Sequence, residues 1–145
     1  MINLIGLEEG ETVCDPFCGT GTTLIESESM GINAIGIDFD EKMCEISKEN
    51  LKINNYKSKI LKSDFQELVK ISKDFDGIVT DLPYGRSSKA SEKPEEILKK
   101  FIAIIPKHKK IAIMYKKEFL LLYTSDAADD LLCIDLVGTS IIRNK

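Results

Sequence analysis

A short apolar segment that runs into a glycine-rich turn constrains the fold of this chain more than any other feature. Residues 12–15 read as a buried strand, and the turn that follows carries glycine at positions 19 and 21. Residues 22–30 then show a helical pattern that stops at Gly31, a residue suited to the left-handed position after a helix. Only glycine lets the backbone of such a turn approach a ligand closely at low conformational cost. The segment predicts a strand, a ligand-binding turn and a helix at the start of an α/β domain.

Strands and helices are predicted to alternate along the next hundred residues or so. Further strands are expected at 34–38, 59–62, 76–81 and 110–114, and helices after Asp40, over 65–71 and from Pro94 onward. Apolar strands separated by helices form a parallel, doubly wound sheet that is covered on both faces. With 145 residues the chain is long enough for one such domain.

Composition and charge restrict the class of protein. Hydrophobic residues make up 43% and charged residues 30% of the chain, which is typical of a globular domain. There is no apolar run of transmembrane length and no basic signal-peptide start, so we expect a cytoplasmic protein without a membrane partner. The four cysteines lack paired metal-binding spacing, which predicts reduced thiols and no metal site. A net charge of −4 argues against strong autonomous binding to nucleic acid.

The last part of the chain breaks the alternation. Residues 123–133 show no clear helical or strand period, and the segment from about Leu122 onward closely resembles translated sequencing-adaptor read-through. We therefore predict that the native domain occupies residues 1–121 and that the tail is foreign sequence. Met1 precedes the first strand by only a short lead-in, so we expect a domain truncated at both ends.

Two acidic residues are placed where a nucleoside cofactor would bind. In open α/β sheets, ligands lie beyond the carboxyl ends of the strands. Asp38 would end the second strand near the surface and accept hydrogen bonds from a ribose diol, and Asp64 would end the third and accept from an adenine amine. A dinucleotide site is the alternative, but Leu24 stands where its fingerprint has a third glycine. Asp15 also opens the turn with a carboxylate, which suits the sulfonium of S-adenosylmethionine better than a pyrophosphate.

The candidate cofactor-binding residues come from the turn and from the ends of the predicted strands. They are Asp15, Phe17, Gly19, Gly21, Asp38, Phe39, Asp64, Phe65 and Asp81, with Phe65 expected beside the adenine ring.

A second group of candidates, predicted to be catalytic, follows the fourth strand: Asp81, Pro83 and Tyr84. An exocyclic amine of a base is a poor nucleophile because its lone pair is delocalised into the ring. Hydrogen bonds from the amine to Asp81 and to a nearby backbone carbonyl would localise that pair. Pro83 would stiffen the corner, and Tyr84 would offer a ring on which a base can stack. The group predicts methyl transfer to a nitrogen of a nucleic-acid base.

Both motifs resemble those of a known family. Asp-Pro-Phe-Cys-Gly-Thr-Gly at 15–21 and Asp-Leu-Pro-Tyr-Gly-Arg-Ser at 81–87 are similar to the catalytic domain of archaeal tRNA guanine-N2 methyltransferases, over about residues 1–117. The resemblance implies a Rossmann-like class I methyltransferase fold and methylation of guanine N2, as in the tRNA (guanine(10)-N2) enzymes. It implies Asp15, Gly19 and Gly21 at the methionine end of S-adenosylmethionine and Asp38 and Asp64 on its nucleoside. Asp81 and Tyr84 would then meet the target guanine.

The chain departs from that family in three ways. Leu82 replaces the first proline of the Asp-Pro-Pro-Tyr form common to amino-methyltransferases. The N-terminal THUMP domain that binds tRNA in the family is missing, so we expect the chain alone to be inactive and tRNA to bind through that missing domain. The family's closing strands after the fifth are absent or replaced, which predicts an exposed sheet edge.

Two other functions remain open at this point. Methylation of amines in DNA or rRNA shares both motifs. A non-catalytic RNA-binding module that retains the fold is the other alternative, although the intact Asp81 and Tyr84 argue against it.

Overall fold

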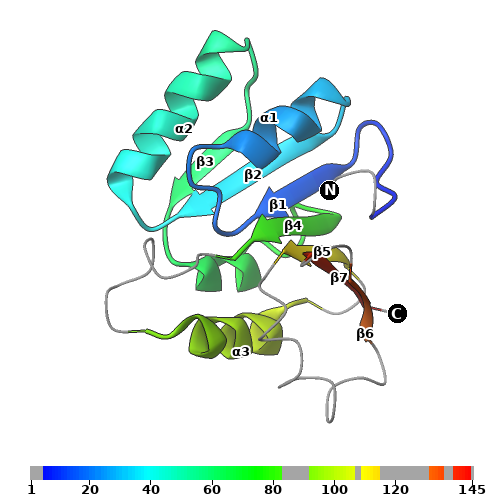
Figure 1. The fold of residues 1–145 in the computed structure, drawn as a ribbon. Coiled ribbons are helices and arrows are strands. Elements are labelled where there is room, and N and C mark those ends of the chain that lie inside the picture. The colour runs from blue at the N-terminus through cyan, green and yellow to red at the C-terminus, as the bar shows by residue number, and fades with distance from the viewer. Residues whose placement is uncertain (1–4, 83–91, 107–108, 115–130, 136–138, 145) are drawn as a thin grey trace.

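The protein folds as one twisted sheet with helices on both faces (Figure 1). The computed structural model describes residues 5–82, 92–106, 109–114, 131–135 and 139–144. Its elements are β1 (Thr12–Asp15), α1 (Thr22–Ser29), β2 (Asn33–Asp38), α2 (Glu41–Ile53), β3 (Lys59–Lys62), the 3₁₀ helix η2 (Phe65–Val69), β4 (Gly77–Asp81), α3 (Pro94–Ile104), β5 (Lys110–Met114), β6 (Leu131–Asp135) and β7 (Thr139–Asn144).

The strand order is β3-β2-β1-β4-β5-β7-β6. Strands β1 to β5 run parallel to their neighbours, which confirms the doubly wound prediction. The order reverses between β1 and β4, which pair directly through Val13 with Gly77 and Cys14 with Ile78. Ligands bind at such a reversal, beyond the carboxyl ends of the strands. The fold therefore places the end of β1 and the end of β4 together at the expected ligand edge.

Alternating side chains of the strands build a separate core on each face of the sheet. On one face, Val13, Val79 and Ala112 pack with Leu24 of α1 and Leu51 of α2. On the other face the neighbouring strand residues join η2 and α3; these are Cys14, Ile78, Ile111 and Ile113, packed with Phe65, Leu68, Ile97, Leu98 and Phe101. Figure 1 shows α1 and α2 above the sheet and η2 and α3 below it. Two-sided burial explains why the strands read as continuous apolar runs.

The prediction of an exposed edge at β5 is wrong. β7 pairs antiparallel with β5, through Ile113 with Ser140 and Met114 with Thr139, and β6 pairs antiparallel with β7. β5 is therefore an interior strand, and the edge strands of the sheet are β3 and β6. These pairings leave the origin of residues 122–145 and the domain boundary near residue 121 as predictions.

Candidate functional site

A cleft of about 630 Å³ opens at the carboxyl ends of β1, β2, β3 and β4. It is lined by the glycine-rich turn, the start of α1 and the residues that follow the strands. The lining residues are Asp15, Pro16, Phe17, Cys18, Gly19, Thr20, Thr22, Thr23, Glu26, Asp38, Phe39, Met43, Ser63, Asp64, Phe65, Asp81 and Leu82. The fold thus brings together every candidate cofactor-binding residue named from the sequence except Gly21.

The two glycines of the turn have different tasks. Gly19 has φ +51° with open space where a Cβ would be, so its conformation is what requires glycine. Gly21 has φ +88° and precedes the first residue of α1, and a Cβ there would lie 2.5 Å from the Oγ atom of Ser47 on α2. Gly21 therefore lets α1 and α2 approach each other and does not line the cleft; direct contact of Gly21 with a cofactor stays a prediction.

Asp38 is buried, with 7% of its surface exposed, so the expectation that it lies near the surface is wrong. Its Oδ2 atom accepts a hydrogen bond from the Gly19 amide at 2.9 Å, and its Oδ1 atom accepts from the Asp40 amide at 2.9 Å. The carboxylate therefore ties the glycine-rich turn to the loop between β2 and α2. A carboxylate has about four acceptor positions, so each oxygen can still accept a hydroxyl from the cleft side.

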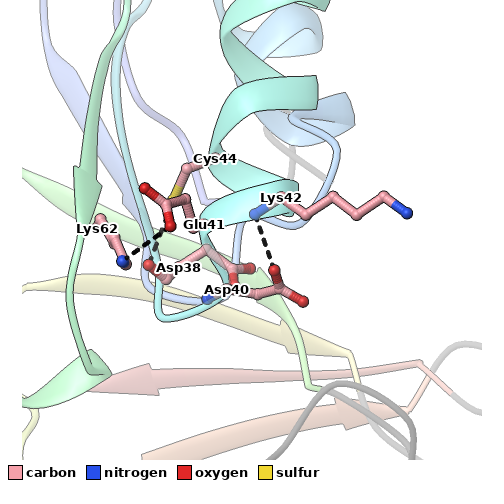
Figure 2. A network of polar contacts seen from close by, with 6 residues as sticks. All are labelled: Asp38, Asp40, Glu41, Lys42, Cys44 and Lys62. Atoms are coloured by element: carbon pink, nitrogen blue, oxygen red, sulfur yellow. Dashed lines mark hydrogen bonds and ion pairs between the residues drawn. The ribbon is translucent and has the colours of Figure 1, made fainter.

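Polar contacts around Asp38 fix the start of α2 (Figure 2). The Oδ1 atom of Asp40 accepts from the Lys42 amide at 2.9 Å, as expected for the residue that caps a helix. The Cys44 thiol donates to the Asp38 backbone carbonyl, and Lys62 of β3 pairs with Glu41 at 3.4 Å. The loop that carries Phe39 is thereby held at both ends. The Phe39 ring is 38% exposed and lines the cleft.

Asp15 is the most enclosed acid of the cleft, with 2% of its surface exposed. Its Oδ1 atom accepts from the Thr80 hydroxyl at 2.7 Å and from the Phe17 amide at 3.0 Å. Burial raises the pKa of Asp15 to about 6, although hydrogen bonds from Thr80, Phe17 and Thr23 oppose the rise; the nearby Asp81 carboxylate adds to it. The group is therefore a carboxylate at neutral pH that titrates close to the physiological range.

An acid and an aromatic cluster form the wall of the cleft that follows the end of β3. Asp64 is exposed and caps η2, its Oδ1 atom accepting from the Gln66 amide at 3.0 Å. The ring of Phe65 packs against Phe17 with a centroid distance of 5.3 Å, and both rings meet Phe101 of α3. This wall offers one carboxylate oxygen and a flat apolar surface, which together suit a purine ring with an exocyclic amine.

Asp81 ends β4 on the opposite side of the cleft from Asp38. It is exposed, and partial desolvation raises its pKa above the ordinary value. Leu82 is buried and also lines the cleft. Pro83 and Tyr84, the other two catalytic candidates, lie outside the described residues, and their roles stay predictions.

The charge of the cleft is one-sided. Five of its lining residues are acidic, and none of the lining residues that the structure describes is lysine, arginine or histidine. Such a surface repels a pyrophosphate and attracts cations and hydrogen-bond donors. The cleft fits a ligand that combines a positive centre with hydroxyl and amine groups.

Sequence reasoning missed the residue that holds Asp15 in place. Thr80 is fully buried in β4, between the apolar Val79 and the acidic Asp81. A polar residue inside a buried strand needs a hydrogen-bond partner, and that signal was available in the sequence. The partner was not, because Asp15 is 65 residues away.

Neither a metal centre nor a membrane span is found within the described ranges. Those residues contain no group of three or more His, Cys, Asp or Glu side chains placed to hold a metal ion. None of the helices they form is long and apolar enough to cross a bilayer.

Comparison with known proteins identifies a family and shows how much of its relatives' length the chain covers. The family described as RMKL-like, methyltransferase domain matches residues 1–124. The tRNA (guanine(10)-N2)-dimethyltransferase of Methanothermobacter thermautotrophicus is 42% identical over 106 residues, which cover 70% of this chain and 31% of that protein. The enzyme of the same name from Methanocaldococcus jannaschii is 35% identical over 127 residues, covering 81% of this chain and 36% of that protein. The chain thus spans about a third of the length of these relatives.

A solved structure has the same fold. A candidate methyltransferase from Streptococcus mutans, in complex with SAH, superposes with a TM-score of 0.67 over 96% of this chain and 91% of that one. The two sequences are 15% identical, so the likeness concerns the fold alone.

Proposed function

Because the chain belongs to the RMKL-like methyltransferase domain family, we propose that its cleft binds S-adenosylmethionine and directs methyl transfer to N2 of a guanine in tRNA. The observation that carries the proposal is the gathering of Asp15, Asp38, Asp64 and Asp81 around one cleft, each at or just after the end of a different parallel strand. The names of the related archaeal enzymes, tRNA (guanine(10)-N2)-dimethyltransferases, supply the substrate, with guanine 10 as the site.

The cleft fits the cofactor in size and in chemistry. Its volume of about 630 Å³ lies in the ordinary range of cofactor pockets, roughly 300–1,000 Å³. Asp38 would receive the ribose hydroxyls on the acceptor positions that its turn hydrogen bonds leave open. Asp64 would receive the adenine amine, with Phe39 and Phe65 against the ring. Asp15 would face the sulfonium and the ammonium group, where its negative charge is stabilising.

The catalytic contribution of the protein is then mainly alignment. Bound S-adenosylmethionine would supply a methyl group on a good leaving group. Asp81 would accept a hydrogen bond from the guanine amine, localising its lone pair toward the methyl group. Holding amine and methyl group in line removes much of the entropic barrier. The raised pKa of Asp81 also makes this carboxylate a better acceptor for the proton that leaves after transfer.

A binding experiment tests the cofactor part. Titration calorimetry with S-adenosylhomocysteine should show saturable binding to the chain, weakened by about tenfold in Asp64→Asn because the amide NH₂ opposes the adenine amine. Asp40→Asn is the matched control, because Asp40 also caps a helix through its Oδ1 atom but does not line the cleft. Equal affinities in Asp64→Asn, Asp40→Asn and the wild type would contradict the assigned orientation.

A transfer experiment tests the substrate part. Labelled methyl groups from S-adenosylmethionine should enter a tRNA transcript and should not enter one with inosine at position 10, because inosine lacks the exocyclic amine. The net charge of −4 suggests that a further domain holds the tRNA, so the assay should also include the chain fused to a THUMP domain. Incorporation into duplex DNA without incorporation into tRNA would favour the DNA alternative.

A further inference from the structure

A buried hydrogen bond joins the end of β1 to β4 behind the residues that line the cleft. Thr80 lies in β4, has no exposed surface and does not line the cleft. Its hydroxyl donates to the Oδ1 atom of Asp15 at 2.7 Å, across the pair of strands where the sheet order reverses. The contact therefore links the end of β1 to the residue just before Asp81.

Resting on the proposed function, we propose that Thr80 is a positioning residue whose hydroxyl keeps the Asp15 carboxylate ionised and turned toward the cationic end of the cofactor. Oδ1 of Asp15 accepts both the Thr80 hydroxyl and the Phe17 amide, and the Thr23 side chain also hydrogen-bonds the carboxylate, so Oδ2 is the less occupied oxygen and the one we expect to face a ligand. Fixing one oxygen sets the plane of the carboxylate and thus the direction of the other.

These hydrogen bonds matter because no cationic side chain among the described lining residues favours the ionised form. Asp81 on β4 adds a like charge, and the Cys14 and Cys18 thiols lie close enough for Asp15 to raise their pKa values. Glu26 contributes a further acid to the cleft from α1. No lysine, arginine or histidine among the described lining residues offsets these groups. Thr80, Phe17 and Thr23 are the groups that lower the pKa of Asp15, and the hydrogen bond from Thr80 is shorter than that from Phe17.

Ligand affinity should depend on pH through the ionisation of Asp15. Because the pKa of Asp15 is about 6, the affinity of the wild-type chain for the cofactor's ammonium end should fall on acidification through that pH. Thr80→Val removes the hydroxyl at nearly constant volume, so Asp15 should hold its proton to higher pH. We expect a loss of affinity of about tenfold at pH 7 that narrows to about twofold at pH 8.

The experiment is calorimetric titration of S-adenosylhomocysteine between pH 5 and 8 with the wild type, Thr80→Val and Thr80→Ser. Thr80→Ser keeps the hydroxyl and should restore the wild-type midpoint. Thr80→Ala serves as a second hydroxyl-free variant if Thr80→Val does not fold. Thr12→Val is the matched control, since Thr12 lies at the other end of β1 and its backbone contacts with Asp76 do not involve its hydroxyl.

Each outcome separates this inference from the proposed function. A midpoint that moves upward in Thr80→Val and returns in Thr80→Ser supports the positioning role. If the wild type binds and the hydroxyl-free variants bind with the same pH midpoint, the positioning role is overturned and the proposed function stays intact. A folded wild-type chain that binds no S-adenosylhomocysteine at any pH overturns both.

Discussion

Asp38 and Asp81 end strands on either side of β1, and their carboxylates lie in opposite environments. Asp38 is buried, and both of its oxygens already accept backbone amides of the turns around it. Asp81 is exposed at the far side of the same cleft. One acid therefore shapes the site while the other is available to a substrate. Position at a strand end places a carboxylate in the cleft. Hydrogen bonds from surrounding backbone amides then determine whether the carboxylate holds the turns together or is exposed to a substrate.

The largest effect should come from the acid on the substrate side. Asp81→Ala should lower methyl transfer by about two to three orders of magnitude, because it removes the acceptor that aligns the amine. Its free energy of unfolding should change by less than about 0.5 kcal/mol, since the side chain is exposed. Initial rates of labelled methyl transfer to tRNA by the chain fused to a THUMP domain measure the first effect, and urea unfolding curves of the chain measure the second. A rate within threefold of the wild type would remove Asp81 from the catalytic group.

Asp38→Ala should show the reverse pattern. The change leaves the Gly19 and Asp40 amides without their charged acceptor, and we expect a loss of about 2–4 kcal/mol in the free energy of unfolding. Cofactor affinity should fall as well, because the glycine-rich turn is no longer tied to β2. Urea titration of Asp38→Ala beside Asp81→Ala tests this contrast. If both variants unfolded at the same urea concentration, the assignment of a structural role to Asp38 alone would be contradicted.

Asp15 adds a third case, because it is buried like Asp38 and, in the proposed function, faces the ligand like Asp81. Its folded-state pKa of about 6 lies above the ordinary 3.8, so the native state binds the proton more tightly than the unfolded state. The stabilisation this gives is complete below about pH 4 and is lost as the pH rises through 6, a change of about 3 kcal/mol. Asp15→Asn should lack this pH dependence and be more stable than the wild type at pH 7, while binding S-adenosylhomocysteine weakly. Thermal unfolding of the wild type and Asp15→Asn between pH 4 and 7 measures this difference in pH dependence. Parallel curves of melting temperature against pH for the two proteins would contradict the raised pKa of Asp15.

The smallest effect concerns the turn that Asp38 holds. Gly19→Ala should cost about 1 kcal/mol, because only the left-handed backbone opposes the methyl group. Gly21→Ala should cost more, about 2–3 kcal/mol, since its Cβ would also lie 2.5 Å from Ser47 Oγ. Unfolding curves of the two variants should therefore differ; equal losses would mean that α1 and α2 separate freely.

Local sequence predicted most of the first five strands, because two-sided burial leaves continuous apolar runs bounded by turns. It also placed the strand-end acids in one cleft, since parallel strands align their carboxyl ends. It could not predict the burial of Asp38, which depends on amides that only the folded turns present. Nor could it predict β6 and β7, because β7 is held by pairing with β5 and β6 by pairing with β7, and local sequence does not show these contacts.

A buried thiol beside the cleft can report how often the glycine-rich turn opens. Cys14 and Cys18 flank Asp15, Cys18 lines the cleft with only 6% of its surface exposed, and burial raises the pKa of both thiols. Thiolates are the reactive form, so alkylation at neutral pH must wait for the turn to open. The rate at which Cys18 is labelled therefore measures how often the turn opens, and a ligand seated on the turn should slow that rate in proportion to its occupancy.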